Sequence, residues 1–164
     1  MITKHSFADI NNESLAEECY DLVKRFSVKQ EVISNVGGIQ LHKIQGYTDS
    51  QSVLFNLEQR LLKLVPEAVD IQLWININFP GCYNKMHTHD EIPGMSGTYY
   101  VQVDEFAGDF VYTHDEITHQ VTPEPGQVLL FSSMMLHGVE PNLSSADRIS
   151  ISFNYVSEKR VIRY

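Results

Sequence analysis

The amino-acid sequence predicts a single α+β domain, mainly β, in which helices near the N-terminus support a β-rich core. Residues 12–66 contain two apolar patterns with helical spacing, whereas from residue 71 onward short β-rich runs alternate with turn residues. The length of 164 residues suits one domain with a substantial core and is short for two. We therefore expect one domain over residues 1–164.

Two helices are predicted in the N-terminal third of the chain. The first has its apolar residues on one stripe over 15–26, with Asn12 or Ser14 as its N-cap. The second begins near Ser50 and ends before Pro66, because the residue before a proline disfavours helical geometry. Between these helices the paired glycines of segment 34–40 predict an irregular stretch.

Six β-rich runs, separated by segments containing proline or glycine, make up the rest of the chain. Many short strands at regular spacing are typical of a sandwich or barrel. We expect the β-core over about 71–156 and the helical support over about 12–66. The predicted runs are residues 71–79, 85–89, 97–103, 109–114, 127–131 and 148–156.

Composition restricts the function classes. Twelve Lys and Arg against 21 Asp and Glu leave a net charge of −9 with His neutral, which disfavours binding to duplex nucleic acid. The N-terminal residues contain no apolar signal-peptide region, and the longest later apolar run, 128–131, is too short to span a membrane. Cys19 and Cys82 are expected as free thiols in a reducing compartment, which predicts a cytoplasmic protein.

Three of the seven histidines form a candidate metal site. His87 and His89 stand two residues apart at the end of a predicted strand, so both imidazoles face the same side. His137, after a later strand, offers a distant third ligand. A close pair with one distant ligand leaves coordination positions open, and nitrogen ligands with open positions suit non-haem Fe(II). By itself, an H-x-H pair is also found as a surface or packing pair.

The last predicted strand carries a second candidate feature. Arg148, Ser150, Ser152 and Asn154 share one face of this strand, while apolar residues alternate on the other. An Arg inside the mouth of a barrel is costly unless it meets an anion, and its planar fork suits a carboxylate, with Ser150 as a further hydroxyl donor. A surface Arg paired with a nearby Glu is the alternative.

Together these motifs resemble the Fe(II)- and 2-oxoglutarate-dependent oxygenases, and more closely the short members of that group from bacteria and marine phages. The resemblance extends from about residue 34 to residue 156. The matching stretches are 34–40, Trp74-Ile75-Asn76-Ile77-Asn78, Asn84-Lys85-Met86-His87-Thr88-His89, Met95–Val101, Pro125-Gly126 to Phe131, His137 with Pro141-Asn142, and Arg148–Asn154.

The resemblance implies a double-stranded β-helix (jelly roll) with Fe(II) at the barrel mouth and 2-oxoglutarate as cosubstrate. His87 and His137 take two ligand positions, and Arg148 takes the position that binds the distal carboxylate of 2-oxoglutarate, with Ser150 beside it. Tyr100 and Asn76 are further candidates for cosubstrate contacts. Asn154, on the Arg148 face, is expected to line the active site.

The third metal ligand departs from the wider family, which has an Asp or Glu at the position of His89. Either His89 completes an all-histidine site, or Asp90 supplies a carboxylate through a local bulge. Strand alternation favours His89. An all-histidine site carries one negative charge less, so we expect a more electrophilic iron that is lost more easily.

The implied reaction is hydroxylation of a C–H bond in a small molecule or peptidyl residue, with release of succinate and CO2. One alternative is a cupin-type dioxygenase or isomerase without 2-oxoglutarate, since Gly81 and the H-x-H pair match the opening of the cupin signature, although its later elements fail. Another alternative is a non-enzymatic jelly-roll binding or structural module. A homodimer through strand edges or segment 159–164 stays open, and a phage-encoded protein would act in the host cytoplasm.

Overall fold

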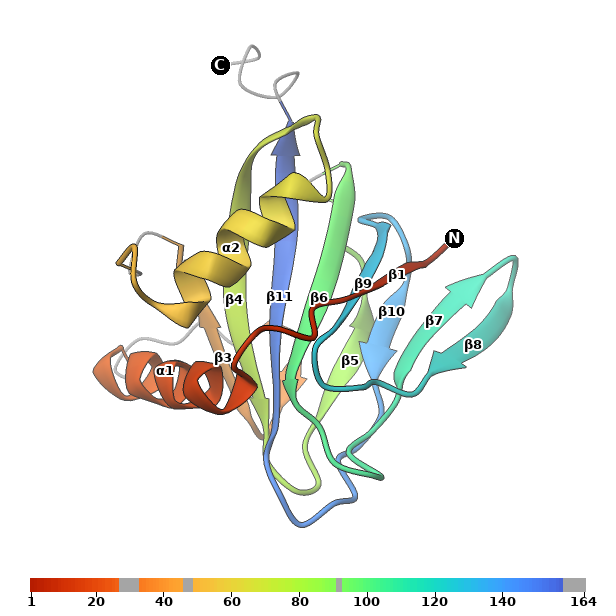
Figure 1. Ribbon diagram of the computed structural model, residues 1–164. Coiled ribbons are helices and arrows are strands. Elements are labelled where there is room, and N and C mark those ends of the chain that lie inside the picture. The colour runs from red at the N-terminus through yellow and green to blue at the C-terminus, as the bar shows by residue number, and fades with distance from the viewer. Residues whose placement is uncertain (27–32, 46–48, 91–92, 158–164) are drawn as a thin grey trace.

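Two antiparallel sheets face each other in the computed structural model, which describes residues 1–26, 33–45, 49–90 and 93–157 (Figure 1). The larger sheet has the order β1 (Thr3–Ser6), β9 (Gln127–Ser132), β6 (Met95–Gln102), β11 (Arg148–Ser157), β4 (Ala68–Asn78) and β3 (Ile39–His42). The smaller sheet has the order β2 (Asn35–Val36), β5 (Tyr83–His87), β10 (His137–Val139), β7 (Phe110–His114) and β8 (Ile117–Val121). This arrangement confirms the predicted mainly-β jelly roll.

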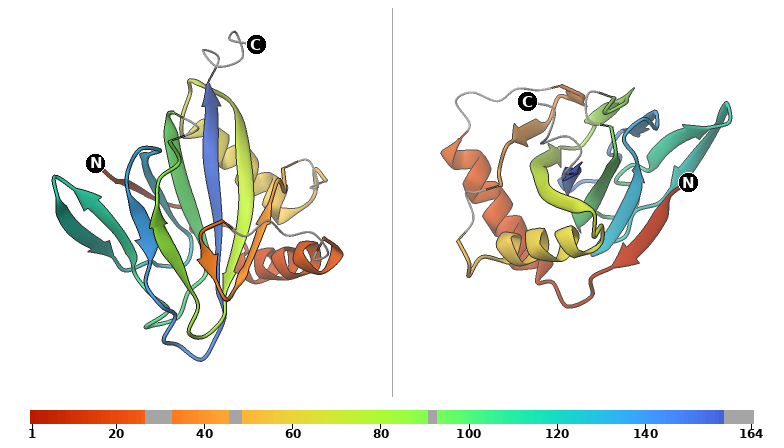
Figure 2. Two further views of the ribbon diagram at one scale, coloured as in Figure 1. Left: turned by 180° about the vertical axis from the view of Figure 1, so that it is seen from behind. Right: turned by 90° about the horizontal axis from the view of Figure 1, so that it is seen from above.

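Two helices cover the outer face of the larger sheet, as the view from above shows (Figure 2). In α1 (Asn12–Arg25) the N-cap is Asn11, whose side chain accepts a hydrogen bond from the Ser14 N–H at 3.1 Å, so the prediction of Asn12 or Ser14 was wrong. In α2 (Val53–Lys63) Ser52 caps the helix in the same way. Both helices place apolar residues on the sheet, which confirms the predicted helical support.

Strand β11 lies at the centre of the larger sheet, between β4 and β6. Its alternation is as predicted: Ile149, Ile151 and Phe153 are fully buried in the main hydrophobic core beneath the helices. Arg148, Ser150 and Asn154 lie on the opposite face and are also buried. The interior between the sheets is therefore polar along β11.

Five strands were not among the predicted runs: β1, β2, β3, β8 and β10. Segment 34–40 is not irregular, because Gly37, with φ of +85°, makes the turn between the short strands β2 and β3. Residues 12–66 therefore contribute two strands besides the helices. Segment 159–164, named above for a dimer, lies outside the described residues. No helix among the described residues is long and apolar enough to span a membrane.

Candidate functional site

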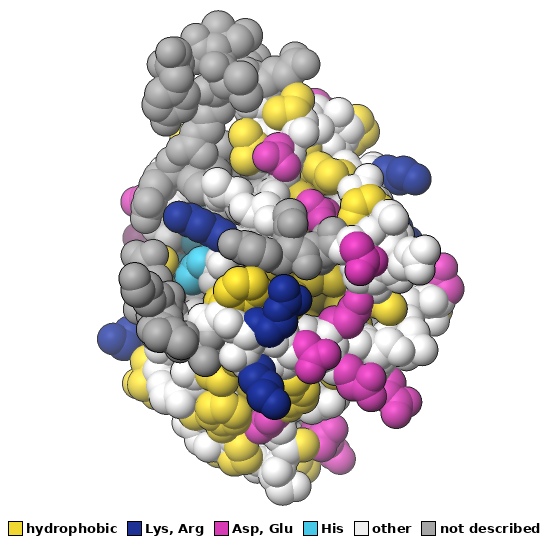
Figure 3. Space-filling view, turned by 90° about the vertical axis from the view of Figure 1, so that its left-hand side faces the viewer, with side chains coloured by type: hydrophobic (Ala, Val, Ile, Leu, Met, Phe, Trp, Pro, Cys, Tyr) yellow, Lys and Arg dark blue, Asp and Glu magenta, His cyan; other side chains and the backbone are white. Residues whose placement is uncertain are grey.

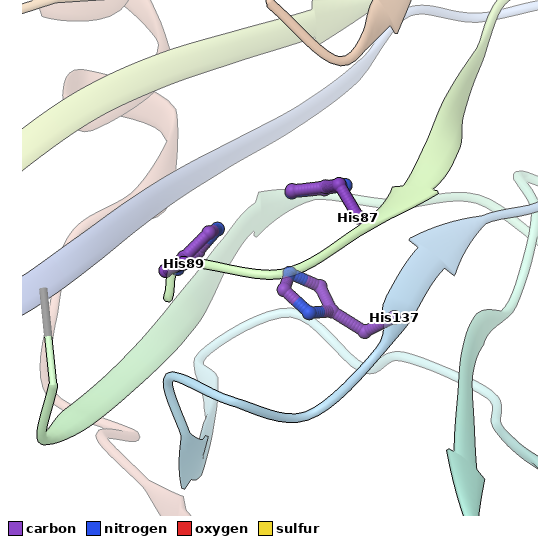
Figure 4. Close-up of side chains that lie close together, drawn as sticks. All are labelled: His87, His89 and His137. Atoms are coloured by element: carbon purple, nitrogen blue, oxygen red, sulfur yellow. The ribbon is translucent and has the colours of Figure 1, made fainter. Parts of the chain in front are cut away.

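The structure brings His87, His89 and His137 together between the two sheets. One ligand nitrogen from each ring can be chosen such that all lie within 4.8 Å of one another. The close-up shows the rings gathered around a common space, with His87 at the end of β5 and His137 at the start of β10 (Figure 4). Among the His, Cys, Asp and Glu side chains of the described ranges, these three histidines form the cluster that could hold a metal ion.

A bulge in β5 turns His87 into the interior. His137 pairs with His87 and Val139 pairs with Asn84, so a step of three residues in β5 faces a step of two in β10. The extra residue puts Asn84 and His87 on the same side, where both line the pocket. Gly138 lies opposite the bulge, and a Cβ there would come 2.9 Å from the Asn84 carbonyl oxygen. The close approach of these strands therefore requires glycine.

His89 reaches the site differently from the sequence prediction. Strand β5 ends at His87, so His89 lies beyond the strand whose alternation was used to place it. Its backbone N–H donates to the Ser133 carbonyl at 2.7 Å, which ties it to the segment before β10. The predicted juxtaposition of the two imidazoles is present, with ring centroids 5.1 Å apart.

The outer nitrogens of two histidines are held by backbone carbonyls. Nδ1 of His87 lies 2.6 Å from the Lys85 carbonyl oxygen, and Nδ1 of His137 lies 2.8 Å from that of Met135. A carbonyl only accepts, so each Nδ1 carries the proton and each Nε2 keeps its lone pair. This second contact is the usual way in which proteins orient histidine ligands.

Burial keeps all three imidazoles neutral at neutral pH. It lowers the pKa of His87, and together with the neighbouring His87 it lowers the pKa of His89 to about 4. Burial and the two other histidines lower the pKa of His137 to about 3. Neutral imidazoles have the lone pairs that a divalent metal ion requires, so the donor set fits a transition metal.

Asp90, the alternative third ligand, is exposed and is not in the histidine group. Its position directly after His89 therefore does not bring its carboxylate to the site.

Arg148 is buried in the same pocket without hydrogen-bond partners for its Nε and Nη2 among the described residues. The side chain is 2% exposed, and its Cζ lies 5.2 Å from the centroid of the Tyr100 ring. The Tyr100 hydroxyl also has no partner in the described part of the chain. Burial lowers the pKa of Arg148, but guanidinium stays protonated because its ordinary pKa is above 12. A buried cation with free donors beside a free hydroxyl is suited to an anion.

Two other predicted cosubstrate contacts, Ser150 and Asn76, also line this pocket, but they differ in whether their polar atoms are free to bind a ligand. Ser150 is buried and faces Tyr100 across the β11–β6 pairing. Asn76 is less available, because its amide accepts from Gln40 and donates to Ser152, each at 3.1 Å. Asn154 accepts a hydrogen bond from the Ser96 hydroxyl, which in turn contacts His89. Ser150 and Asn76 therefore lie in the pocket as predicted, although Asn76 already has partners, whereas Asn154 was predicted to line the site and is not among the lining residues.

Three residues that contact the histidines were given no role from the sequence: Trp74, Ser96 and Phe110. Trp74 packs edge-on against His89 at 5.5 Å between ring centroids, and Phe110 stacks on His137 at 5.6 Å. Ser96 could have been found from the alternation of β6, because positions 96, 98 and 100 share the face of Tyr100. No comparable signal exists for Phe110 and Trp74, since aromatic residues are equally expected in a core.

Charged side chains are unevenly distributed on the face of the molecule that Figure 3 shows. On the face shown in Figure 3, Asp and Glu side chains gather on one half, while a histidine is visible on the other half among basic side chains.

Comparison with known proteins agrees with this geometry. Residues 111–154 match the model of a family described as "Putative 2OG-Fe(II) oxygenase", which confirms the resemblance over that segment. The matched segment contains His137 and Arg148 but not His87 or His89. None of the curated protein sequences matches the chain.

Solved structures share the fold at low sequence identity. A Pseudomonas putida prolyl-4-hydroxylase is 16% identical with a TM-score of 0.77, covering 96% of this chain and 92% of that chain. A Trichoplax adhaerens prolyl hydroxylase, in complex with a peptide fragment of the hypoxia-inducible factor oxygen degradation domain, is 13% identical with a TM-score of 0.77, covering 99% and 87%. HygX from Streptomyces hygroscopicus, with nickel and 2-oxoglutarate bound, is 13% identical with a TM-score of 0.72, covering 96% and 83%.

Proposed function

We propose that this chain is an Fe(II)- and 2-oxoglutarate-dependent oxygenase that hydroxylates a C–H bond of a small molecule or peptidyl residue. The observation that carries the proposal is the buried Arg148, whose Nε and Nη2 lack partners in the described residues, in one pocket with three neutral histidines. The metal donors and the anion site are thus side by side. The family match over 111–154 supports the same chemistry.

His87, His89 and His137 would hold the iron through their Nε2 atoms. The carbonyl contacts of His87 and His137 support this assignment, because they leave those lone pairs directed away from the backbone. The exposure of Asp90 supports His89 as the third ligand. Three protein ligands would leave coordination positions of the metal open for a chelating cosubstrate.

Arg148 would bind the far carboxylate of 2-oxoglutarate. Its guanidinium offers donors that the described protein leaves unused, and the Tyr100 hydroxyl and Ser150 lie on the same side. With iron, 2-oxoglutarate and O2 bound, the site would supply oxidative decarboxylation to succinate and CO2 coupled to hydroxylation. The protein would hold the reactants in position. The positive charge of Arg148 would be balanced when the dicarboxylate binds.

The lining around the histidines indicates which part of a substrate reaches the metal. Trp74, Phe110, Phe131 and Val139 line the pocket, and Arg148 is its one charged lining residue among those described. Since Arg148 is assigned to the cosubstrate, the reacting part of the substrate would be uncharged. Both an apolar part of a small molecule and a neutral peptidyl residue satisfy this requirement.

We retain a cytoplasmic location as a prediction, supported by the absence of a disulfide between Cys19 and Cys82, which are both buried free thiols. A homodimer also remains a prediction.

The test is an anaerobic titration of the Fe(II)-loaded protein with 2-oxoglutarate, followed through the visible metal-to-ligand charge-transfer band. We expect the band in wild type, loss of iron in H87A, H89A and H137A, and retained iron in D90A. Succinate production under O2 is the second measurement. Iron binding without the band would overturn the proposal in favour of a metal enzyme that does not use 2-oxoglutarate. Loss of metal in D90A but not in H89A would overturn the ligand assignment.

A further inference from the structure

His89 differs from the other two histidines in what contacts its outer nitrogen. His87 and His137 face backbone carbonyls, whereas Nδ1 of His89 lies 3.0 Å from the Ser96 hydroxyl. A carbonyl only accepts, so it fixes the protonated nitrogen. A hydroxyl can donate or accept, so Ser96 alone would not decide which nitrogen of His89 carries the proton.

Asn154 removes this ambiguity. The Ser96 hydroxyl donates its one proton to Oδ1 of Asn154 at 2.7 Å, so its oxygen is left to accept from His89 Nδ1–H. We propose that Ser96 and Asn154 are positioning residues, which hold His89 as the Nδ1–H tautomer and direct its Nε2 toward the metal. This inference rests on the metal-binding role proposed for His89.

The relay comes from rigid parts of the fold. Ser96 on β6 and Asn154 on β11 pair directly across the larger sheet and are 0% and 7% exposed. His89 itself lies beyond the end of β5, where no strand pairing fixes its ring. The larger sheet therefore supplies the orientation that His87 and His137 obtain from carbonyls two residues before them.

This arrangement gives β11 two roles at the site. Arg148 opens the strand, and Asn154 lies six residues later on the same face. Metal orientation through His89 and anion binding through Arg148 are thus built on one strand. The proposed donor set consists of neutral histidines without a carboxylate. The direction of each Nε2 lone pair is therefore set by the hydrogen bond to the other ring nitrogen.

The first test measures Ni(II) affinity of the metal-free protein by calorimetry. S96A should weaken binding by about 10- to 100-fold, the range typical of lost contacts to ligand histidines. The matched control is Y99F, which removes a buried hydroxyl from the same strand on its other face, where Tyr99 contacts Asn12. The control should bind Ni(II) as wild type does. Equal affinities for S96A and wild type would overturn the proposal.

The second test observes the tautomers directly, by long-range ¹H–¹⁵N NMR of the imidazoles in the metal-free protein. We expect His89 as the Nδ1–H form in wild type and a mixture with the Nε2–H form in S96A. His87 and His137 should keep their forms in both proteins. An Nε2–H form of His89 in wild type would overturn the proposal, whatever 2-oxoglutarate binding shows, so the two proposals fail separately.

A double-mutant cycle tests whether the two residues act through one chain of hydrogen bonds. N154L should weaken Ni(II) binding less than S96A, because the Ser96 oxygen can still accept in one of its rotamers. The double variant should be no weaker than S96A alone. Additive losses would show two independent effects and would contradict a relay.

Discussion

The two faces of β11 are both largely inaccessible to water, but they are stabilised in different ways. On the outer face, Ile149, Ile151 and Phe153 are each 0% exposed and pack beneath the helices. On the inner face, Asn154 is hydrogen-bonded to Ser96 and Ser152 to Asn76, whereas two guanidinium nitrogens of Arg148 lack partners in the described structure. The outer face is fully packed in the folded protein. On the inner face, the guanidinium of Arg148 lacks hydrogen-bond partners for two of its nitrogens among the described residues.

The difference indicates where the strand serves stability and where it serves binding. Apolar packing lowers the free energy of the native state without any ligand. A buried guanidinium without partners raises that free energy, because its lost hydration is not replaced. The deficit at Arg148 is therefore a cost to the fold that an entering carboxylate would offset, which leads to opposite expectations for mutations on the two faces.

The largest expected effect is on the apolar face. F153A should lower the free energy of unfolding by about 3–5 kcal/mol, because the lost ring leaves a cavity in a packed core. Gly97 lies against this ring, since a Cβ there would be 2.5 Å from Phe153 Cζ. Because glycine has no side chain, this neighbour cannot fill the space that the lost ring would leave. Urea denaturation measures the change. A loss below about 1 kcal/mol would contradict the close packing of this face.

A change at Arg148 should separate stability from binding. R148M keeps a long side chain but removes the charge, so we expect the free energy of unfolding to stay equal or rise, by about 1 kcal/mol at most. The affinity for 2-oxoglutarate should fall by about 30-fold or more, equivalent to about 2 kcal/mol. Calorimetric titration and urea denaturation measure the two quantities. The exposed Arg25 provides the control, because R25M should alter neither. A large loss of stability in R148M would mean that Arg148 is structural.

The smallest effect is expected in the hydrogen-bonded part of the inner face. S152A removes the acceptor of the Asn76 amide but leaves the Gln40 contact, so the free energy of unfolding should fall by about 0.5–1.5 kcal/mol. Ni(II) affinity should be unchanged, since no described contact joins Ser152 to a histidine. Thermal unfolding with and without Ni(II) checks both statements. A smaller Ni(II)-induced shift than in wild type would show that this part of the face also supports the metal.

Sequence patterns predicted the long elements well because each buries a continuous stripe of side chains. The alternation of β11 placed Arg148, Ser150 and Asn154 on the inner face, and the helical stripes placed α1 and α2 on the sheet. Short elements were missed for the converse reason. β2 has two residues and β10 has three, so they form through pairing with neighbours rather than through their own pattern.

Contacts that depend on distant segments were equally beyond sequence patterns. The bulge opposite Gly138 is visible only when β5 and β10 are paired, and regular alternation would have placed Asn84 and His87 on opposite faces. The contact of Ser96 with Asn154 joins residues 58 positions apart. Asn11 rather than Asn12 caps α1, and neighbouring asparagines do not reveal which of them adopts the cap conformation.

The sequence by itself determined the β-rich class of the protein, the faces of its long strands and the residue types that a metal and a dicarboxylate would need. Those properties follow from local periodicity and side-chain chemistry, which act within a few residues. The tertiary structure decided that His87, His89 and His137 share one space, that Asp90 stays outside it and that Arg148 lacks partners for two nitrogens among the described residues. Each of these depends on strands brought together from distant parts of the chain, where pairing register and desolvation set which groups meet.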